Sequence, residues 1–342
     1  MAVVPIQKAD IIQLEAPSQD HLQQQDSGSG LEGSVPSPLD MAPPGAYYYL
    51  TEGLEGVEAQ RYRCTESFMT AINLQTDQLH SGNASQYAVF SHITPHQLAD
   101  LNRFRDTHCK SLRFLYYEYE ETLVVKITPG AAHEVALTRF EIILTLKIAS
   151  IGLLDEISYT RAATYKGTEC GKEPDSSFRS RQFRPYATNW PTLVIECGVP
   201  ESINRLRVDS NWWFANSEAQ VKTVLLISIS EKDRKILIEQ WEMLPEVNPQ
   251  VTCHELNPAR IRPECIRTIE IVEADAGGAS LQLSFQNLFL REPVQGETDI
   301  VFTTRDLERF AAYVWLDPRP EPLSIRSSKS SISDPGSQLR LA

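Results

Sequence analysis

The sequence holds few cysteines, and they lie far apart. They form no CxxC pair and no Cys/His cluster, and the six positions are Cys64, Cys109, Cys170, Cys197, Cys253 and Cys265. A disulfide framework needs denser cysteines in a smaller secreted chain, and a structural zinc site needs paired ligands. The cysteine pattern therefore argues against both.

Long apolar runs and targeting signals are also missing. No apolar run approaches the roughly 20 residues that a transmembrane helix needs. The first residues, MAVVPIQKADIIQLEAP, lack the basic start, apolar core and small-residue cleavage site of a secretory signal. We therefore expect an intracellular protein that does not enter the membrane. Nuclear and cytoplasmic residence are both open, because the sequence has no cluster of basic residues.

Motifs for several common chemistries are absent as well. The sequence has no GxGxxG or GxxxxGK(S/T) pattern, so it signals neither a dinucleotide site nor a phosphate-binding loop. It also has no GxSxG elbow and no HExxH zinc motif. What remains is a chain of 342 residues with 42% hydrophobic content, which is enough to bury a substantial core.

Positive charge is scarce. The chain has 32 Lys and Arg residues against 45 Asp and Glu residues, a formal net charge of −13. Since contacts to nucleic-acid phosphates need Lys and Arg, this balance argues against tight nucleic-acid binding. Residues 1–60 hold nine acidic residues and one basic residue, Lys8. Residues 132–242, with 15 acidic and 14 basic side chains, are close to neutral, which permits DNA binding without indicating it.

The clearest hydrophobic pattern begins at His133. Apolar residues recur there at i, i+3 and i+4 intervals and predict a helix of about 18 residues that ends at Gly152. Three strands, a helix and two strands are expected next, at residues 157–167, 171–178, 192–197, 201–217, 221–230 and 235–242. The strand at 192–197 is almost wholly apolar, which is typical of a strand buried on both faces. This order predicts an α/β fold with a mixed sheet.

Further elements are expected on both sides of this core. Thr94-Pro95 indicates a helix start, and residues 112–129 indicate two strands. The aromatic side chains of that stretch either pack within a strand, which we favour, or form a surface on which bases stack; they are Phe114, Tyr116, Tyr117 and Tyr119. Added strands and a final helix are expected at 265–274, 280–290, 298–303 and 305–315.

Two acidic residues stand out by their position. Asp175 follows Pro174 at the start of a strand, and Glu196 ends an apolar strand that would otherwise be wholly buried. A carboxylate inside a strand costs several kcal/mol unless it is paired or bound to a cation. Side by side, Asp175 and Glu196 would suit Mg²⁺, which binds one or two protein carboxylates together with water and phosphate oxygens. Such a site supports metal-assisted attack of water on a phosphodiester.

The Pro174-Asp175 pair, the 20 residues that follow it and the E-x-(K) pattern that begins at Glu196 resemble the PD-(D/E)XK restriction-endonuclease-like superfamily. A fungal branch with a degenerate motif is more similar still, over TYKGTECGKEPDSSF, WPTLVIECGVPES, LRVDSNWWFANS and VKTVLLISI. The resemblance covers roughly a third of the chain. It implies a restriction-endonuclease-like core that acts on DNA, with Asp175 and Glu196 as catalytic Mg²⁺ ligands and Glu134 as an additional acidic ligand.

One residue of the family pattern is missing. The pattern places a lysine two residues after the glutamate, where this chain has Gly198. That lysine orients the attacking water and stabilises negative charge, and the loss of one such contact typically costs about 3–4 kcal/mol, or roughly 10²–10³ in rate. Either another side chain has taken over, or the site is degenerate and kept for its fold. The candidates for a replacement are Lys172, Lys222, Arg205 and Arg207, of which Lys222 heads the strand next to the site.

The acidic residues also have structural interpretations. Asp175 would then cap a turn, and Glu196 would form a buried ion pair with Arg205 or Arg207. Glu134 would be a solvated carboxylate at the start of a helix.

Four further residues near the motif have both a functional and a structural interpretation. We expect His133 to be exposed rather than a proton relay. Of Trp212 and Trp213, we expect one in the core and the other partly exposed, rather than a pair that stacks on bases. Cys197 is interpreted as a small core residue, because no histidine follows it closely in the sequence.

Two functional hypotheses follow. The first is a metal-dependent nuclease, or a nuclease relative, that acts on DNA phosphodiesters with Mg²⁺ and uses Lys222 or Lys172 in place of the missing lysine. The second is a non-catalytic pseudo-nuclease that binds another protein, through its tails, as an accessory factor in a fungal pathway. The acidic charge and the absent lysine favour the second, and the carboxylate pair favours the first.

The sequence also predicts how the chain is divided. Low hydrophobicity with many Gln, Ser, Gly and Pro residues predicts disordered tails, an acidic one at 1–45 and another at 319–342. Residues 46–130 are interpreted as an N-terminal elaboration and 131–245 as the PD-(D/E)XK-like core. Residues 246–318 would add C-terminal strands and a helix that pack on the core.

Overall fold

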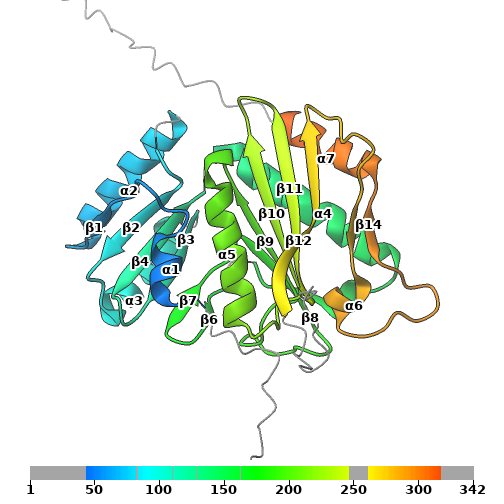
Figure 1. Ribbon diagram of the computed structural model, residues 1–342, viewed down its shortest axis with the longest axis horizontal. Helices are drawn as coiled ribbons and strands as arrows, with labels where there is room; N and C mark the ends of the chain where they lie inside the picture. Colours follow the sequence, from blue (N-terminus) through cyan, green and yellow to red (C-terminus); the bar gives the residue numbers. More distant parts are fainter. Residues whose placement is uncertain are drawn as a thin grey trace, which may run out of the picture. The chain divides into compact units, whose positions relative to one another are not determined.

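The computed structural model describes residues 44–81, 84–109, 111–128, 130–161, 163–245 and 261–316 (Figure 1). Two six-stranded sheets and one two-stranded sheet organise the described residues. The expected tails lie outside the described residues, apart from residues 44 and 45. In the described ranges, none of the helices combines the length and the apolar character that crossing a membrane requires.

The first sheet comes mainly from the segment before the expected core. Its strands follow the order β1-β2-β4-β3-β7-β6. They are β1 Ala59–Arg61, β2 Tyr87–Ser91, β3 Leu112–Tyr117, β4 Thr122–Ile127, β6 Tyr165–Lys166 and β7 Cys170–Lys172. The two strands expected within residues 112–129 are thus confirmed as β3 and β4, which pair antiparallel.

Three helices accompany this sheet: α1 Ala46–Thr51, α2 Thr65–His80 and α3 Pro95–His108. The start of α3 is the one that Thr94-Pro95 predicts. Thr94 Oγ1 accepts a hydrogen bond from the Gln97 backbone N–H, and Gln97 Oε1 accepts one from the Thr94 N–H. This reciprocal capping satisfies backbone donors that the first helical turn leaves unpaired, and so fixes where the helix begins.

Side chains of β3 alternate between two buried layers. Phe114 and Tyr116 pack with α2 and α3, whereas Leu115 and Tyr117 face the layer that also contains α5 (Ile203–Asn216). Tyr119, in the turn after β3, is 75% exposed. The aromatic run therefore serves strand packing, as favoured from the sequence, and does not form a continuous surface for stacked bases.

The second sheet contains the strongly apolar strands. Its order is β12-β11-β10-β9-β8-β5, in which β9 and β10 run parallel and the other neighbours antiparallel. The strands are β5 Ile157–Tyr159, β8 Ser176–Ser180, β9 Leu193–Gly198, β10 Thr223–Ser230, β11 Lys235–Pro245 and β12 Ile261–Val272. The protein is a mixed α/β structure with mixed sheets, as the sequence predicts.

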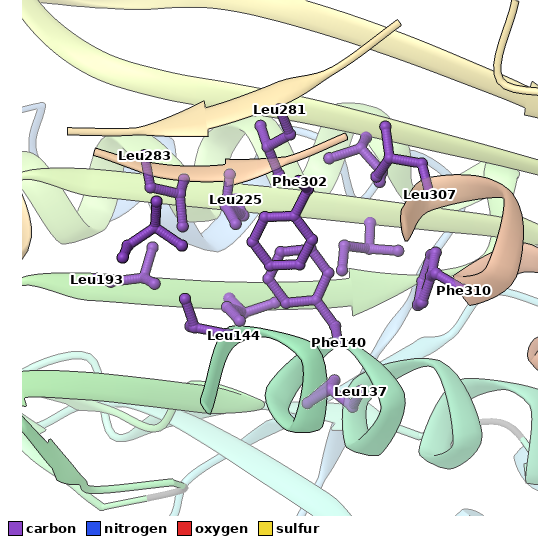
Figure 2. Close-up of a cluster of buried hydrophobic side chains, with 14 of the residues drawn as sticks. Leu137, Phe140, Leu144, Leu193, Leu225, Leu281, Leu283, Phe302, Leu307 and Phe310 are labelled. Carbon is purple, nitrogen blue, oxygen red and sulfur yellow. The ribbon is translucent and has the colours of Figure 1, made fainter. Parts of the chain in front are cut away.

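Helices cover both faces of the second sheet. One face packs against α4 (Gly130–Ser150) and α7 (Thr304–Leu316), and the other packs against α5 (Figure 1). Figure 2 shows Phe140 of α4 stacked on Phe302, with ring centroids 4.6 Å apart, close to Leu193 and Leu225 of the sheet. Phe302 belongs to β14 (Ile300–Phe302), which pairs with β13 (Leu281–Leu283). The C-terminal elements are therefore part of this core.

Residues 157–167 differ from the single strand that the sequence predicts. They form β5 and β6, which belong to different sheets. Arg161 adopts a φ of 44°, and the Ala163 backbone N–H donates to the Thr160 carbonyl, so the chain turns out of the second sheet there. Between α4 and α5 the chain therefore makes five strands: β5, β8 and β9 stay in the second sheet, while β6 and β7 join the first.

Two other boundaries differ from the expected ones. Helix α4 spans Gly130–Ser150, so it begins three residues before His133 and ends before Gly152. Residues 280–290 form β13 and then a short helix, α6 (Phe285–Phe289), instead of one strand. The helix forms because Ser284 Oγ accepts a hydrogen bond from the Asn287 backbone N–H, which caps its first turn.

Candidate functional site

The two acidic residues singled out from the sequence lie together. Asp175 directly precedes β8, and Glu196 lies in β9, where Ser176 pairs with Ile195. Both carboxylates accept a hydrogen bond from the same ammonium group: Lys126 Nζ is 2.6 Å from Asp175 Oδ2 and 2.7 Å from Glu196 Oε2. The side chains of Asp175 and Glu196 are 0% exposed, and that of Lys126 is 5% exposed. Lys126 belongs to β4, so it links the two sheets.

A second carboxylate centre adjoins this one. Lys172 of β7 lies with its Nζ 3.7 Å from Glu196 Oε1 and 3.1 Å from Asp209 Oδ1. Asp209, on α5, also faces Arg205 Nη2 at 3.2 Å and accepts a hydrogen bond from the Tyr87 hydroxyl at 3.2 Å. All of these charged side chains are buried. The three carboxylates and the cations Lys126, Lys172 and Arg205 therefore form one buried network, and Arg113 Nε also lies 3.6 Å from Asp175 Oδ1.

Helix α4 contributes a histidine to the site. His133 Nε2 lies 3.1 Å from the Cys197 carbonyl oxygen and 3.6 Å from Asp175 Oδ2. The backbone N–H of Cys197 donates to Asp175 Oδ2 at 2.8 Å. The expectation that His133 is exposed is therefore wrong: it is buried, because the first turn of α4 packs against the end of β9.

The surrounding charges keep Asp175, Lys126 and His133 ionised. Burial alone raises the pKa of the Asp175 carboxyl, but Lys126 and His133 outweigh burial and hold this pKa well below its ordinary range. Burial likewise lowers the pKa of the Lys126 ammonium, but Asp175 and Glu196 outweigh it and place this pKa well above its ordinary value. Burial also opposes the charge on His133, yet contacts with Cys197 and Asp175 raise its pKa to about 10. At neutral pH the Asp175 carboxylate therefore faces a charged ammonium and a charged imidazolium.

Of the candidate replacements for the missing lysine, Lys172 reaches the site and Lys222 does not. Glu196 pairs across the sheet with Leu226 of β10, and Lys222 lies four residues earlier, which is about 13 Å along a strand. Lys222 Nζ donates instead to the Ala219 carbonyl oxygen at 2.9 Å. The reason is register: Lys222 lies beside the start of β9, where its backbone N–H donates to the Thr192 carbonyl, four residues before Glu196.

The other acidic and basic candidates take different partners from those expected. Glu134 is exposed, so it does not join its buried neighbour His133 at the site. Arg205 pairs with Asp209, and Arg207 pairs with Glu239 rather than with Glu196. Glu196 is a buried ion-pair partner, but its cations are lysines.

The tryptophan pair also differs from the expectation that one ring is partly exposed. Trp212 and Trp213 are both 0% exposed, with ring centroids 5.0 Å apart in an edge-on arrangement. Trp213 Nε1 donates a hydrogen bond to Glu196 Oε1 at 2.9 Å. Trp213 therefore belongs to the site as a neutral donor, and it leaves no face free for a base.

The position of the missing lysine is closed. A Cβ atom added at Gly198 would lie 2.7 Å from Gln86 Oε1 and 3.2 Å from Leu206 Cδ1. Gln86 is itself 0% exposed and accepts a hydrogen bond from the Val199 backbone N–H at 3.2 Å. A longer side chain at Gly198 would have to displace a buried, hydrogen-bonded amide.

The residues of the site do not fit a divalent metal ion in this arrangement. Mg²⁺ needs near-octahedral oxygen ligands and retains several water molecules, whereas here an ammonium group lies between the two carboxylate oxygens. Within the described part of the chain, no group of three or more His, Cys, Asp and Glu side chains lies together as a metal ligand set. Two surface hollows of about 280 and 410 Å³ lie beside β1 and α2, and neither Asp175 nor Glu196 lines them.

Sequence reasoning missed Lys126 and Asp209. Lys126 is the charged residue of the apolar strand TLVVKI, and Asp209 follows Leu206 and precedes Trp213 on the buried side of α5. A charge on an otherwise apolar face needs a buried partner, and that signal could have found both. The partners of Lys126 could not be found in this way, because Lys126 lies 49 residues from Asp175 and 70 from Glu196 along the chain.

Comparisons with known proteins leave the function open. The sequence matches no protein-family model, and no curated protein matches it either. One solved structure that resembles the chain is described as a "putative nuclease belonging to DUF820" from Anabaena variabilis. The likeness covers 58% of this chain and 90% of that one, with 12% sequence identity and a TM-score of 0.33.

Proposed function

We propose that this protein is a pseudo-nuclease: a PD-(D/E)XK-like core whose carboxylate site is closed by its own lysines, and which acts by binding a protein partner instead of cutting DNA. The observation that carries the proposal is the Lys126 ammonium, held within 2.7 Å of both Asp175 and Glu196. Intracellular residence and the fungal origin stay predictions from the sequence.

The nuclease-like core is supported by the order of its elements and by where the carboxylates lie. Helix α4 is followed by β5, β8 and β9 in one sheet, then by α5 and by β10, which runs parallel to β9. Asp175 directly precedes β8 and Glu196 lies in the adjacent strand β9, at the positions where the sequence resembles the superfamily. This arrangement accords with a restriction-endonuclease-like core.

The absence of catalysis is supported by burial and by charge. A phosphodiester has to approach the carboxylates, yet their side chains are 0% exposed. A metal ion would have to displace an ammonium that makes two short charge-assisted hydrogen bonds, which are among the stronger contacts in proteins. The space next to Gly198, where the family places its lysine, is filled by Gln86.

A second candidate is the Mg²⁺-dependent nuclease. It is favoured by the lysines at the site, since Lys126 or Lys172 would supply the positive charge that Gly198 lacks. In that case Lys126 would move off the carboxylates when the ion binds, and DNA would enter from the side that the first sheet now covers. The net charge of −13 counts against this candidate, because phosphate contacts need Lys and Arg.

The two candidates are separated by calorimetric titration of Mg²⁺ and Mn²⁺ into the purified full chain, together with a plasmid-nicking assay. The matched control is the Asp175→Asn/Glu196→Gln variant, which keeps the shape of both side chains. The pseudo-nuclease binds neither ion at the site and nicks no DNA, and the control behaves identically. Ion binding and nicking that both disappear in the control would refute the proposal and establish the nuclease.

A further inference from the structure

The outward side of helix α4 is apolar, although a surface helix normally carries polar residues there. Its inward side, which includes Phe140 and Leu144, belongs to the core beneath it. The exposed or half-exposed residues that recur at helical spacing on the other side are Thr138, Ile142, Thr145, Leu146 and Ala149. A helix that is apolar on both sides is typically buried on both sides.

Helix α7, which packs beside α4 on the same core, shows the normal pattern instead. Its buried residues include Leu307 and Phe310, and its exposed residues include Arg305 and Arg309. On α4, by contrast, the Leu146 side chain is 64% exposed and that of Ile142 is 42% exposed. Within the described ranges of the chain, this apolar side of α4 is left uncovered.

Neighbouring aromatic side chains extend this surface on both flanks. The Tyr159 hydroxyl donates to Thr145 Oγ1 at 2.6 Å, and the Tyr313 ring of α7 lies 4.0 Å from the Arg139 guanidinium carbon. A helix of 21 residues is about 31 Å long, and two helices packed side by side are roughly 20 Å wide. The area of about 600 Å² per partner is at the lower end of what specific protein interfaces bury.

We propose that the α4 outer face, formed by Thr138, Ile142, Thr145, Leu146 and Ala149, binds a second copy of this chain. A two-fold dimer needs a surface that is complementary to itself. If the two α4 helices pack antiparallel about an axis between Ile142 and Leu146, each Ile142 faces Leu146 of the other copy. The other three side chains are small, so they let the two helices approach closely.

The charges around this face favour a second copy over a different protein. Charged groups give complexes between different proteins much of their specificity, whereas homodimer interfaces are more apolar. The charged residues that border the α4 outer face have partners in their own chain: Arg139 lies over Tyr313, and Glu141 Oε1 accepts a hydrogen bond from Ser176. The centre of the face therefore buries no charge when two copies meet.

This inference goes beyond the pseudo-nuclease assignment and does not depend on it. His133 extends from the inward side of α4 to the carboxylate site, where its Nε2 lies 3.1 Å from the Cys197 carbonyl oxygen. The α4 outer face is on the other side of the helix, so a dimer formed there leaves the carboxylate site as it is.

Sedimentation velocity of the full chain at a series of concentrations tests the dimer. The monomer has a mass of 38.6 kDa, and we expect wild type to approach twice that mass as its concentration rises. Leu146→Glu should weaken the dimer on the order of tenfold or more, because it places a charge at the centre of the interface. The matched control is Leu74→Glu on α2, where Leu74 is 57% exposed, and it should leave the dimer unchanged.

A mixing experiment tests the two-fold arrangement. Ile142→Lys and Leu146→Glu should each be monomeric alone, because each dimer would then bury unpaired charges. An equimolar mixture should form a dimer, since the introduced ammonium of one copy faces the introduced carboxylate of the other. The second contact between Ile142 and Leu146 stays apolar in that mixed dimer.

Wild type that keeps the monomer mass at every concentration would overturn the inference and leave the α4 outer face to a different protein. A wild-type dimer that Leu146→Glu does not weaken would overturn it as well, because the contact then lies elsewhere. A mixture that stays monomeric would refute the antiparallel arrangement. If a charged variant does not fold, as judged by circular dichroism, Leu146→Ala with Leu74→Ala as its control makes the same comparison. All of these outcomes are independent of the Mg²⁺ and Mn²⁺ titrations that test the pseudo-nuclease assignment.

Discussion

Replacement of Lys126 by methionine isolates the ammonium, because methionine keeps most of the apolar stem and removes the charge. The change leaves Asp175 and Glu196 buried at 0% exposure with their nearest cation gone. Removal of one partner from a buried ion pair typically costs about 3–5 kcal/mol. For a chain of this size, 1 kcal/mol shifts the melting temperature by roughly 2–4 °C, so the expected loss is roughly 6–20 °C.

The loss of stability caused by Lys126→Met should be smaller when the negative charge of Glu196, which then lacks its ammonium partner, is removed as well. We expect Lys126→Met/Glu196→Gln to be more stable than Lys126→Met, with a favourable coupling of about 1–3 kcal/mol in a double-mutant cycle. Urea unfolding followed by tryptophan fluorescence is a suitable assay, since Trp213 is buried and hydrogen-bonded to Glu196. Lys222→Met is the control: its ammonium bonds one backbone carbonyl, so a loss of only about 1 kcal/mol is expected.

The reasoning is refuted if Lys126→Met costs no more than Lys222→Met. It is also refuted if Glu196→Gln adds to the loss instead of relieving it. Either result would mean that the ammonium does not compensate the carboxylates in the folded protein.

Three further outcomes are expected. Gly198→Ala should lower stability by about 1–3 kcal/mol in urea unfolding, because its Cβ would meet Gln86 Oε1 at 2.7 Å; no loss would show that the family's lysine position is open. Phe302→Ala should cost about 3–5 kcal/mol by the same assay, since the ring is 0% exposed and stacked on Phe140; a loss below 1 kcal/mol would mean that β14 is not part of the core. Burial opposes the charge on Asp306, but its hydrogen bonds with Lys147 and Thr303 outweigh burial and lower its pKa below 3.8. The ionised Asp306 carboxylate therefore stabilises the folded protein above pH 3.8, and this stabilisation is lost as the pH falls through the lowered pKa of Asp306. Melting temperatures should show wild type above Asp306→Asn near neutral pH and the difference shrinking in acid; a difference that grows in acid would contradict the sign.

The parts of the fold that were predicted correctly are those that local periodicity determines. Helices α4 and α5 and strands β9, β10 and β11 bury long apolar patterns, so their sequences alone indicate them. The departure of β6 and β7 into the first sheet was not predicted, because it depends on pairing with β3, a strand more than 50 residues earlier. Strand pairing over such distances leaves no periodic signal in either segment.

At the candidate site, too, the features that local sequence determines could be predicted and those that depend on distant strands could not. Glu196 could be singled out because a carboxylate within an apolar strand needs compensation, and Asp175 because it follows Pro174 at the start of a strand. The cation that compensates these carboxylates could not be predicted, because Lys126 comes from β4, outside the expected core. Lys222 was favoured as the replacement lysine only because it heads the neighbouring strand. Its distance from Glu196 depends on the register of β10 against β9, which the sequence does not reveal.

The most direct test of the closed site is a crystal structure of the wild-type protein grown or soaked in MnCl₂, with anomalous diffraction measured for manganese. A site closed by Lys126 gives no anomalous peak between Asp175 and Glu196, and the ammonium is seen within hydrogen-bond distance of both carboxylates. A manganese peak between the two carboxylates, with the Lys126 side chain displaced, would contradict the pseudo-nuclease assignment and favour a metal-dependent nuclease.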